Sequence, residues 1–114
     1  MELIKVIDII GTKSAISPPR ALRLYDYIIQ KIKSDDKLNI SFEDVQDLTS
    51  AFCNASIGKL YMNIDIKILD TQLLITGIEE SHIWFKKIRD AILLGTNENA
   101  RILHKSNLEE VILS

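Results

Sequence analysis

The chain has 114 residues, 46% of them hydrophobic and 26% charged, and its formal net charge is −2. This length and composition are typical of one globular domain with a single core, and they exclude an intrinsically disordered segment. Because the charge offers no excess of positive field for phosphates, we do not expect nucleic acid to be the main partner.

The N-terminal segment, Met1–Gly11, is predicted to be a strand buried on both faces. Its apolar run stops at Gly11 and consists of Leu3, Ile4, Val6, Ile7, Ile9 and Ile10. The segment lacks the basic start and the cleavage site of a signal peptide. The sequence contains no uncharged apolar run near the roughly 20 residues that cross a bilayer, so we expect a soluble protein. The single cysteine, Cys53, fits a reducing compartment, so we expect the cytoplasm.

A loop over Gly11–Ser17 and a helix follow. Ser17–Pro19 is typical of a helix start, because serine can cap free N–H groups and proline is tolerated in the first turn. The apolar face of this helix consists of Ala21, Leu24, Tyr25, Ile28 and Ile32. The charged run Lys33–Lys37 is expected to end the helix, and Leu38–Phe42 is predicted to be the second strand.

A polar loop over Glu43–Thr49 is expected to lead into a second helix, from Ser50 to about Met62. At 100° per residue its core side consists of Phe52, Cys53, Ser56 and Leu60. The other side, Ala51, Asn54, Ala55 and Gly58, is small and nearly flat. Thr49 and Ser50 place hydroxyls beside the free N–H groups of the helix start, where they can cap the helix or favour an anion.

The last third of the chain is predicted to contain strands, a helix and an apolar tail. Ile64, Ile66 and Ile68 alternate with polar residues, and with Leu73–Thr76 they form either one bent strand or a hairpin. A helix from about Glu80 carries an apolar stripe of Trp84, Phe85, Ile88, Ala91 and Ile92. Gly95–Asn99 is expected to end it. The tail Ala100–Ser114 is too apolar to be free, and it should pack on the domain or on a partner.

The order of predicted elements, strand and helix in alternation, favours a single α/β domain over residues 1–114 with a central sheet flanked by helices. Each predicted element contributes apolar residues to one common core. We expect this core to contain Val6, Ile28, Ile40, Phe52 and Trp84.

Few side chains in the sequence can carry catalysis. Cys53, His82 and His104 are the only thiol and imidazoles, and their spacing matches neither a metal site nor a nucleophile with its base. Cys53 is expected to be a small buried core residue, and a single cysteine cannot form an internal disulfide. We therefore predict no catalytic residue, no metal site and no cofactor.

The small face of the second predicted helix is the candidate partner-binding surface. It lacks lysine, glutamate and arginine, the residues that ordinarily fill a solvated helix face, and consists of Ser50, Ala51, Asn54, Ala55 and Gly58, with Tyr61 and Met62 at its far end. One alternative interpretation is that the alanines and the glycine only allow tight packing inside this domain, with Thr49 or Ser50 as a plain helix cap. Another is that the apolar tail covers this face within the same chain.

Three stretches resemble a known family: Ser17–Leu24 (SPPRALRL), Ser41–Val45 (SFEDV) and Thr49–Tyr61 are similar to the STAS-like family of domains of unknown function. More broadly, the strand at 38–42, followed by Thr49, Ser50 and a helix of small residues, resembles the STAS domain of anti-sigma-factor antagonists. The resemblance extends over about residues 4–91. It implies a mixed central β-sheet flanked by helices, with residues 96–114 as a C-terminal extension.

The STAS resemblance implies a function as well as a fold. STAS domains are switch modules without catalysis of their own, and in the best-known members a partner kinase with the histidine-kinase-like ATPase fold phosphorylates a serine at a helix start and so abolishes binding. The resemblance thus implies a non-enzymatic regulatory module that binds such an ATPase. The serine corresponds to Ser50, with Thr49 as the second candidate for phosphorylation. The aspartate and glycine of the family's Asp-Ser-Ser-Gly pattern are absent here.

Two other functions remain open from the residues. In the first, the loop Gly11–Ser17 and the Thr49-Ser50 helix start bind an anionic nucleotide, and the domain is a small-ligand sensor. In the second, the chain is a subunit of an enzyme whose active site is completed only in a homo-oligomer.

Overall fold

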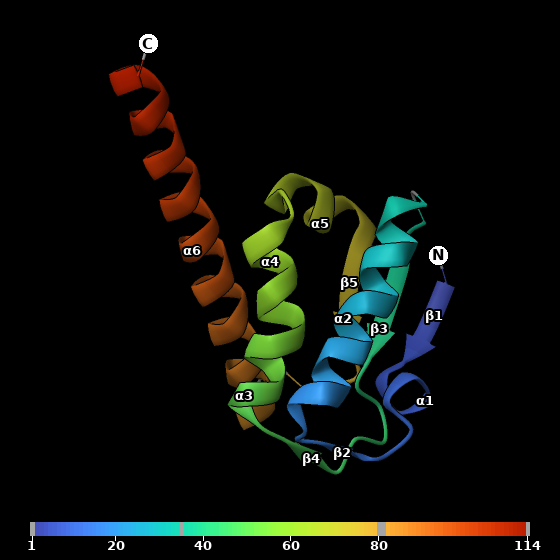
Figure 1. The fold of residues 1–114 in the computed structure, drawn as a ribbon. Helices are drawn as coiled ribbons and strands as arrows, with labels where there is room; N and C mark the ends of the chain where they lie inside the picture. Colours follow the sequence, from blue (N-terminus) through green and yellow to red (C-terminus); the bar gives the residue numbers. More distant parts are fainter. Residues whose placement is uncertain (1, 35, 80–81, 114) are drawn as a thin grey trace.

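The computed structural model describes residues 2–34, 36–79 and 82–113, with side chains up to residue 101 (Figure 1). The strands are β1 (Glu2–Lys5), β2 (Ser14–Ala15), β3 (Leu38–Ser41), β4 (Asp47–Leu48) and β5 (Leu73–Thr76). The helices are α1 (Val6–Ile10), α2 (Pro18–Lys33), α3 (Ser50–Cys53), the π-helical segment η1 (Asn54–Gly58), α4 (Lys59–Asn63), α5 (Ile66–Gln72) and α6 (Ile83–Leu113).

The main sheet has the strand order β1-β3-β5, and β2 and β4 form a separate two-stranded sheet. In the main sheet Ile4 lies beside Ile40, and Ile40 lies beside Ile75. All pairings in the described part of the chain are parallel. The predicted α/β class with flanking helices is confirmed, whereas the mixed sheet that the resemblance implied is wrong, because helical connections bring successive strands back in one direction.

The two faces of the main sheet are buried to different extents. Leu38 and Ile40 are fully buried. Successive side chains of a strand point to opposite faces of the sheet. On the other face, Leu3 is 60% and Leu74 is 46% exposed. The helices therefore pack on one face of the sheet, and the opposite face is partly open.

The predicted strand over Met1–Gly11 is wrong beyond Lys5, because α1 follows directly. Val6 and Ile10 are both fully buried, and they lie one helical turn apart on the core side of α1. Gly11 closes this turn with φ 75° and donates its N–H to the Ile7 carbonyl at 2.9 Å. A run of β-branched residues fits a buried helix turn as well as a strand, so periodicity could not separate the two.

The helix predicted after Ser17 is confirmed as α2. Its apolar face is buried as expected, with Tyr25 half-buried, although Ser17 makes no side-chain cap bond. The predicted strand 38–42 is confirmed as β3. Both predicted loops contain a short strand, β2 in the first and β4 in the second.

The predicted strand over Ile64–Ile68 is wrong, because α5 occupies this region. The Asp65 carboxylate accepts the N–H of Lys67 at 2.8 Å and so caps the helix start. Ile66 and Ile68 are 41% and 42% exposed, so their alternation with polar residues does not mark a buried face. The predicted strand at Leu73–Thr76 is confirmed as β5, and the region is therefore neither a bent strand nor a hairpin.

Helix α6 runs without a break through the predicted stop at Gly95–Asn99. Its 31 residues span about 46 Å, close to the longest dimension of the molecule, 52 Å. Gly95 lies inside the helix because it packs closely on another helix, as described below. In Figure 1 the last part of α6, shown in red, extends beyond the other elements.

The predicted core is confirmed for Val6, Ile28, Ile40 and Phe52, which are all fully buried. Trp84 is only partly buried and packs against this core from its edge. In the described part of the chain, no helix is both long and apolar enough to cross a membrane.

Candidate functional site

The candidate surface lies on one helical stretch that runs from Ser50 to Asn63 through α3, η1 and α4. Thr49 caps its start, since its hydroxyl oxygen accepts the N–H of Phe52 at 3.1 Å. The alternative that Thr49 is a helix cap is therefore confirmed. Ser50 is the first helical residue and is exposed, and its hydroxyl makes no hydrogen bond within the described residues.

The segment before the helix start is held from two sides. Thr49 donates its N–H to the Ala15 carbonyl at 3.2 Å, alongside the β2–β4 pairing. From the other side, the ammonium group of Lys87 in α6 donates to the Leu48 carbonyl at 2.9 Å. The helix start is thus fixed in position by elements far away in the sequence.

The two segments that an anion sensor would use lie side by side, because β2 and β4 pair. Their polar groups, however, bond one another. The Ser14 hydroxyl donates to the Asp47 carboxylate at 2.9 Å, and Gln46 donates its N–H to the Lys13 carbonyl at 2.8 Å. These hydrogen bonds stabilise the contact between the two segments. They leave fewer hydrogen-bond donors directed at a ligand.

The π-helical segment, in the middle of the stretch, lies in close contact with α6. A Cβ added to Gly58 would lie 3.0 Å from the Ala91 carbonyl oxygen, and one added to Gly95 would overlap the Gly58 carbonyl oxygen. Nearby, the buried Ser56 hydroxyl donates to the Phe52 carbonyl at 2.7 Å. Single π-turns inside helices often occur at functional sites, and this one shapes a helix–helix contact.

The seven residues of the predicted partner-binding surface do not share one environment. Ser50, Ala51 and Asn54 are exposed, and Ala55 and Met62 are half-buried. The prediction that Gly58 and Tyr61 are surface residues is wrong, because both are buried. Gly58 packs on Ala91, and the Asn99 side chain donates to the Tyr61 carbonyl at 3.2 Å.

A groove lies where the exposed and buried parts of this stretch meet. It encloses 380 Å³ and is lined by Leu22 of α2, by Asn54, Ala55, Gly58, Lys59 and Met62, and by Ala91, Leu94, Gly95 and Glu98 of α6. Leu22 is 42% and Leu94 is 53% exposed. Neither leucine was predicted from the sequence to belong to the site. Leu22 could have been noticed, because it lies off the apolar stripe of its helix.

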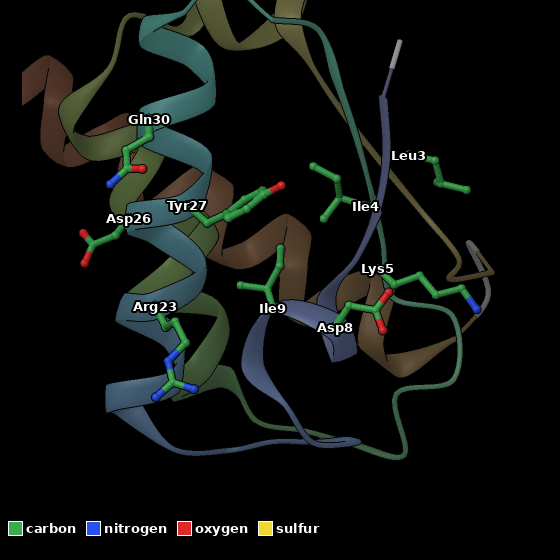
Figure 2. A pocket seen from close by; sticks show the side chains of 9 residues that line it. All are labelled: Leu3, Ile4, Lys5, Asp8, Ile9, Arg23, Asp26, Tyr27 and Gln30. Atoms are coloured by element: carbon green, nitrogen blue, oxygen red, sulfur yellow. The ribbon is translucent and has the colours of Figure 1, made fainter.

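A second cavity, of 810 Å³, lies beside β1. Figure 2 shows Ile4, Ile9 and Tyr27 between β1 and α2, whereas Asp26 and Gln30 point away from this space. Polar groups that fix a small ligand converge on it, and here they diverge. We therefore assign no ligand to this cavity.

The residues considered for catalysis lie in different environments. Cys53 is fully buried, and burial raises the pKa of its thiol to about 12, although Lys87 acts in the opposite direction. His82 is exposed and accepts the N–H of Trp84 at 3.1 Å through Nδ1. His104 lies outside the described side chains. Among the described residues, no group of three or more His, Cys, Asp or Glu side chains could hold a metal ion.

One comparison with known proteins gives a match. A family model described as a STAS-like domain of unknown function (DUF4325) matches residues 20–82, which is more than half of the chain. The matched part contains the whole helical stretch of residues 50–63, together with β3, β5 and all of α2 except its first two residues. No curated protein and no solved structure matches the chain.

Proposed function

The chain belongs to the family of STAS-like domains of unknown function, and we propose that it is a non-enzymatic regulatory module that acts by binding another protein. The supporting observation is the exposed helix start that carries Ser50, Ala51 and Asn54. It is uncharged, and Thr49 and Lys87 hold it in place. A preorganised surface with few long charged side chains loses little entropy and little hydration when a partner binds.

We propose that the partner contacts Ser50, Ala51, Asn54, Ala55 and Met62, which we call the helix-start surface. These residues keep at least part of their surface accessible, unlike Gly58 and Tyr61. Family resemblance favours a histidine-kinase-like ATPase as the partner. Because such a partner uses ATP, we propose that the complex forms in the cytoplasm.

Ser50 is the better of the two candidates for phosphorylation. Its hydroxyl is exposed and carries no hydrogen bond in the described structure, whereas the Thr49 hydroxyl already caps the helix. The partner would transfer the γ-phosphoryl group of ATP to the Ser50 oxygen and release ADP. A phosphate at this position is tolerated by the positive end of the helix, but it adds about −1.5 to −2 charges to an uncharged surface and so weakens partner binding.

A pair of matched arginine substitutions tests the surface. We would capture tagged chains from the native cell and compare Asn54→Arg with Gln30→Arg, which places the same side chain on an exposed part of α2. We expect both variants to melt like the parent chain, but only Asn54→Arg to lose the captured partner. If Asn54→Arg retained the partner, the helix-start surface would not be the binding site. A rise in melting temperature on addition of nucleotides would instead favour the small-ligand sensor.

Phosphorylation has a separate test. The chain is incubated with the captured ATPase and ATP, and the peptide that contains Thr49 and Ser50 is analysed by mass spectrometry. We expect one phosphate on Ser50, and none on the Ser50→Ala variant. Phosphate on Thr49, or none on either residue, would contradict the proposed switch and leave the binding surface to be judged by the capture experiment.

A further inference from the structure

The groove beside the helix-start surface is apolar and open. Leu22 of α2 and Leu94 of α6 line it and are each about half exposed, and Ala55 and Met62 also belong to its lining. Lys59 and Glu98 are the charged residues at its rim. Exposed leucines that line a groove favour an apolar occupant.

The chain itself contains an apolar helix segment of suitable kind. After residue 101, α6 extends away from the rest of the molecule (Figure 1). The sequence of residues 102–113 contains Ile102, Leu103, Leu108, Val111, Ile112 and Leu113. Burial of these apolar side chains against another apolar surface would be favourable. We call residues 102–113 the α6 end.

We propose that the α6 end of each chain binds in the groove of a second copy, so that two chains form a symmetric dimer. The groove is centred near Gly95, and the middle of the α6 end lies near residue 108. Thirteen residues of straight helix separate the two points by about 20 Å. If the two α6 helices run antiparallel with a two-fold axis near residues 101 and 102, each groove meets the other copy's α6 end, and both contacts form together.

Two features of the charge distribution fit the antiparallel arrangement. Glu98, at the rim of the groove, bonds Arg101 of its own chain at 2.6 Å, and the arrangement places position 105 of the second copy, a lysine, opposite it. Glu109 and Glu110 of the second copy come opposite residues 94 and 93, about one helical turn from the exposed Arg89. A parallel arrangement would place Glu98 beside the same glutamate of the second copy. Opposite charges across an interface favour one orientation over the other.

The purified chain alone tests the dimer, by sedimentation over a concentration series from about 1 to 100 µM. We expect a dimer for the parent chain and a monomer for two variants, a chain that ends at residue 101 and Leu94→Glu. Ile83→Glu is the matched control, because Ile83 is 66% exposed on the same helix but outside the groove. It should dimerise like the parent chain, while Leu94→Glu should stay monomeric up to about 100 µM.

Mixing the two defective chains gives a sharper test. The Leu94→Glu chain keeps its α6 end, and the shortened chain keeps its groove, so together they can form one of the two contacts. We expect a mixed dimer where each chain alone is monomeric. A monomeric parent chain, a dimer of the shortened chain, or a dimer of Leu94→Glu would overturn the proposal. If the shortened chain does not fold, Leu94→Glu and its Ile83→Glu control still decide the result.

This inference does not depend on the proposed partner, because it concerns the purified chain alone. The two proposals do share residues, since Asn54, Ala55 and Met62 line the groove and belong to the helix-start surface. Self-association would therefore cover part of the surface proposed for the partner.

Discussion

The helical stretch of residues 50–63 has two regions built from similar small residues, and the molecule uses them in opposite ways. At its start Ser50, Ala51 and Asn54 are exposed. In its middle, Gly58 is buried against Ala91, and its carbonyl lies against Gly95. Small residues permit a close helix contact, but they do not require one. The comparison teaches that the neighbouring helix, and not residue size, decides whether such a face is packed or free.

The largest effect is expected for Gly58→Arg. An arginine side chain cannot pass the Ala91 backbone, whose carbonyl oxygen would lie 3.0 Å from the new Cβ. Overpacking together with an unpaired buried charge should lower the free energy of unfolding by about 3 kcal/mol or more. Thermal melts followed by circular dichroism measure the loss. Asn54→Arg, one turn earlier on the exposed region, is the control, and equal melting of the two variants would contradict the comparison.

Gly95→Ala tests the other side of the same contact. Alanine gains up to about 1 kcal/mol of helix propensity over glycine. Its Cβ, however, would overlap the Gly58 carbonyl oxygen, and backbone cannot move aside as a side chain can. We expect a net loss of about 1 to 2 kcal/mol in urea unfolding. The exposed Asn97→Ala in the same helix should not destabilise the chain, and a stabilised Gly95→Ala variant would show that the contact is loose.

Cys53, on the core side of the stretch, gives a pH-dependent test. Burial raises the pKa of its thiol from 9.0 to about 12, so between these values the unfolded chain loses a proton that the folded chain keeps. The stabilisation from this group is therefore largest below about pH 9 and decreases as the pH rises, by on the order of 1 kcal/mol at pH 10. Urea unfolding at pH 8 and pH 10 should show a smaller decrease for Cys53→Ala. A native thiol that reacts with iodoacetamide as fast as the unfolded one would contradict burial.

Thr49→Ala examines the cap that precedes the exposed region. Removing the acceptor of the Phe52 N–H should cost about 1 kcal/mol. Thr49→Ser keeps the acceptor and should retain most of the stability. Guanidinium unfolding of the two variants measures the difference, and a Thr49→Ala variant as stable as Thr49→Ser would mean that the hydroxyl contributes no cap.

The smallest effect is expected for Ser50→Asp. Ser50 is exposed at the first helical position, where the positive end of the helix favours a carboxylate by about 0.3 to 1 kcal/mol. We expect the melting temperature to stay constant or to rise slightly, while binding of the captured partner weakens. A clear drop in the melting temperature would show that Ser50 is packed and would remove it from the helix-start surface.

The molecule also shows where the spacing of apolar residues in the sequence predicts secondary structure and where it does not. Helix α2 could be predicted because its start has Pro18 and Pro19 and its apolar stripe has one consistent spacing. In contrast, Ile64, Ile66 and Ile68 alternate as in a strand, yet Asp65 caps a helix there and Ile66 and Ile68 remain exposed. Alternation predicts a strand only when one set of side chains is buried, and burial depends on neighbours that are distant in the sequence.

The candidate site also has one part that could be predicted from the sequence and one part that could not. Its helix start, with the Thr49 cap and the exposed Ser50, could be predicted from local residue types. The groove could not, since Leu22 and Leu94 come from two helices far apart in the sequence. Tight packing of the small face was one of the alternatives from the sequence, but the helix that packs on Gly58 could not be identified, because a glycine at position 95 is typical of a helix end.

By itself the sequence determined the α/β class, most of the core, α2, β3, β5 and the helix start, because these depend on apolar spacing and on capping groups a few residues apart. The tertiary structure alone decided that α6 continues through Gly95, that it covers Gly58 and Tyr61, and that a groove opens beside Leu94. These features depend on how closely two helix backbones approach. That distance is set by the packing of the whole domain, which no local pattern in the sequence contains.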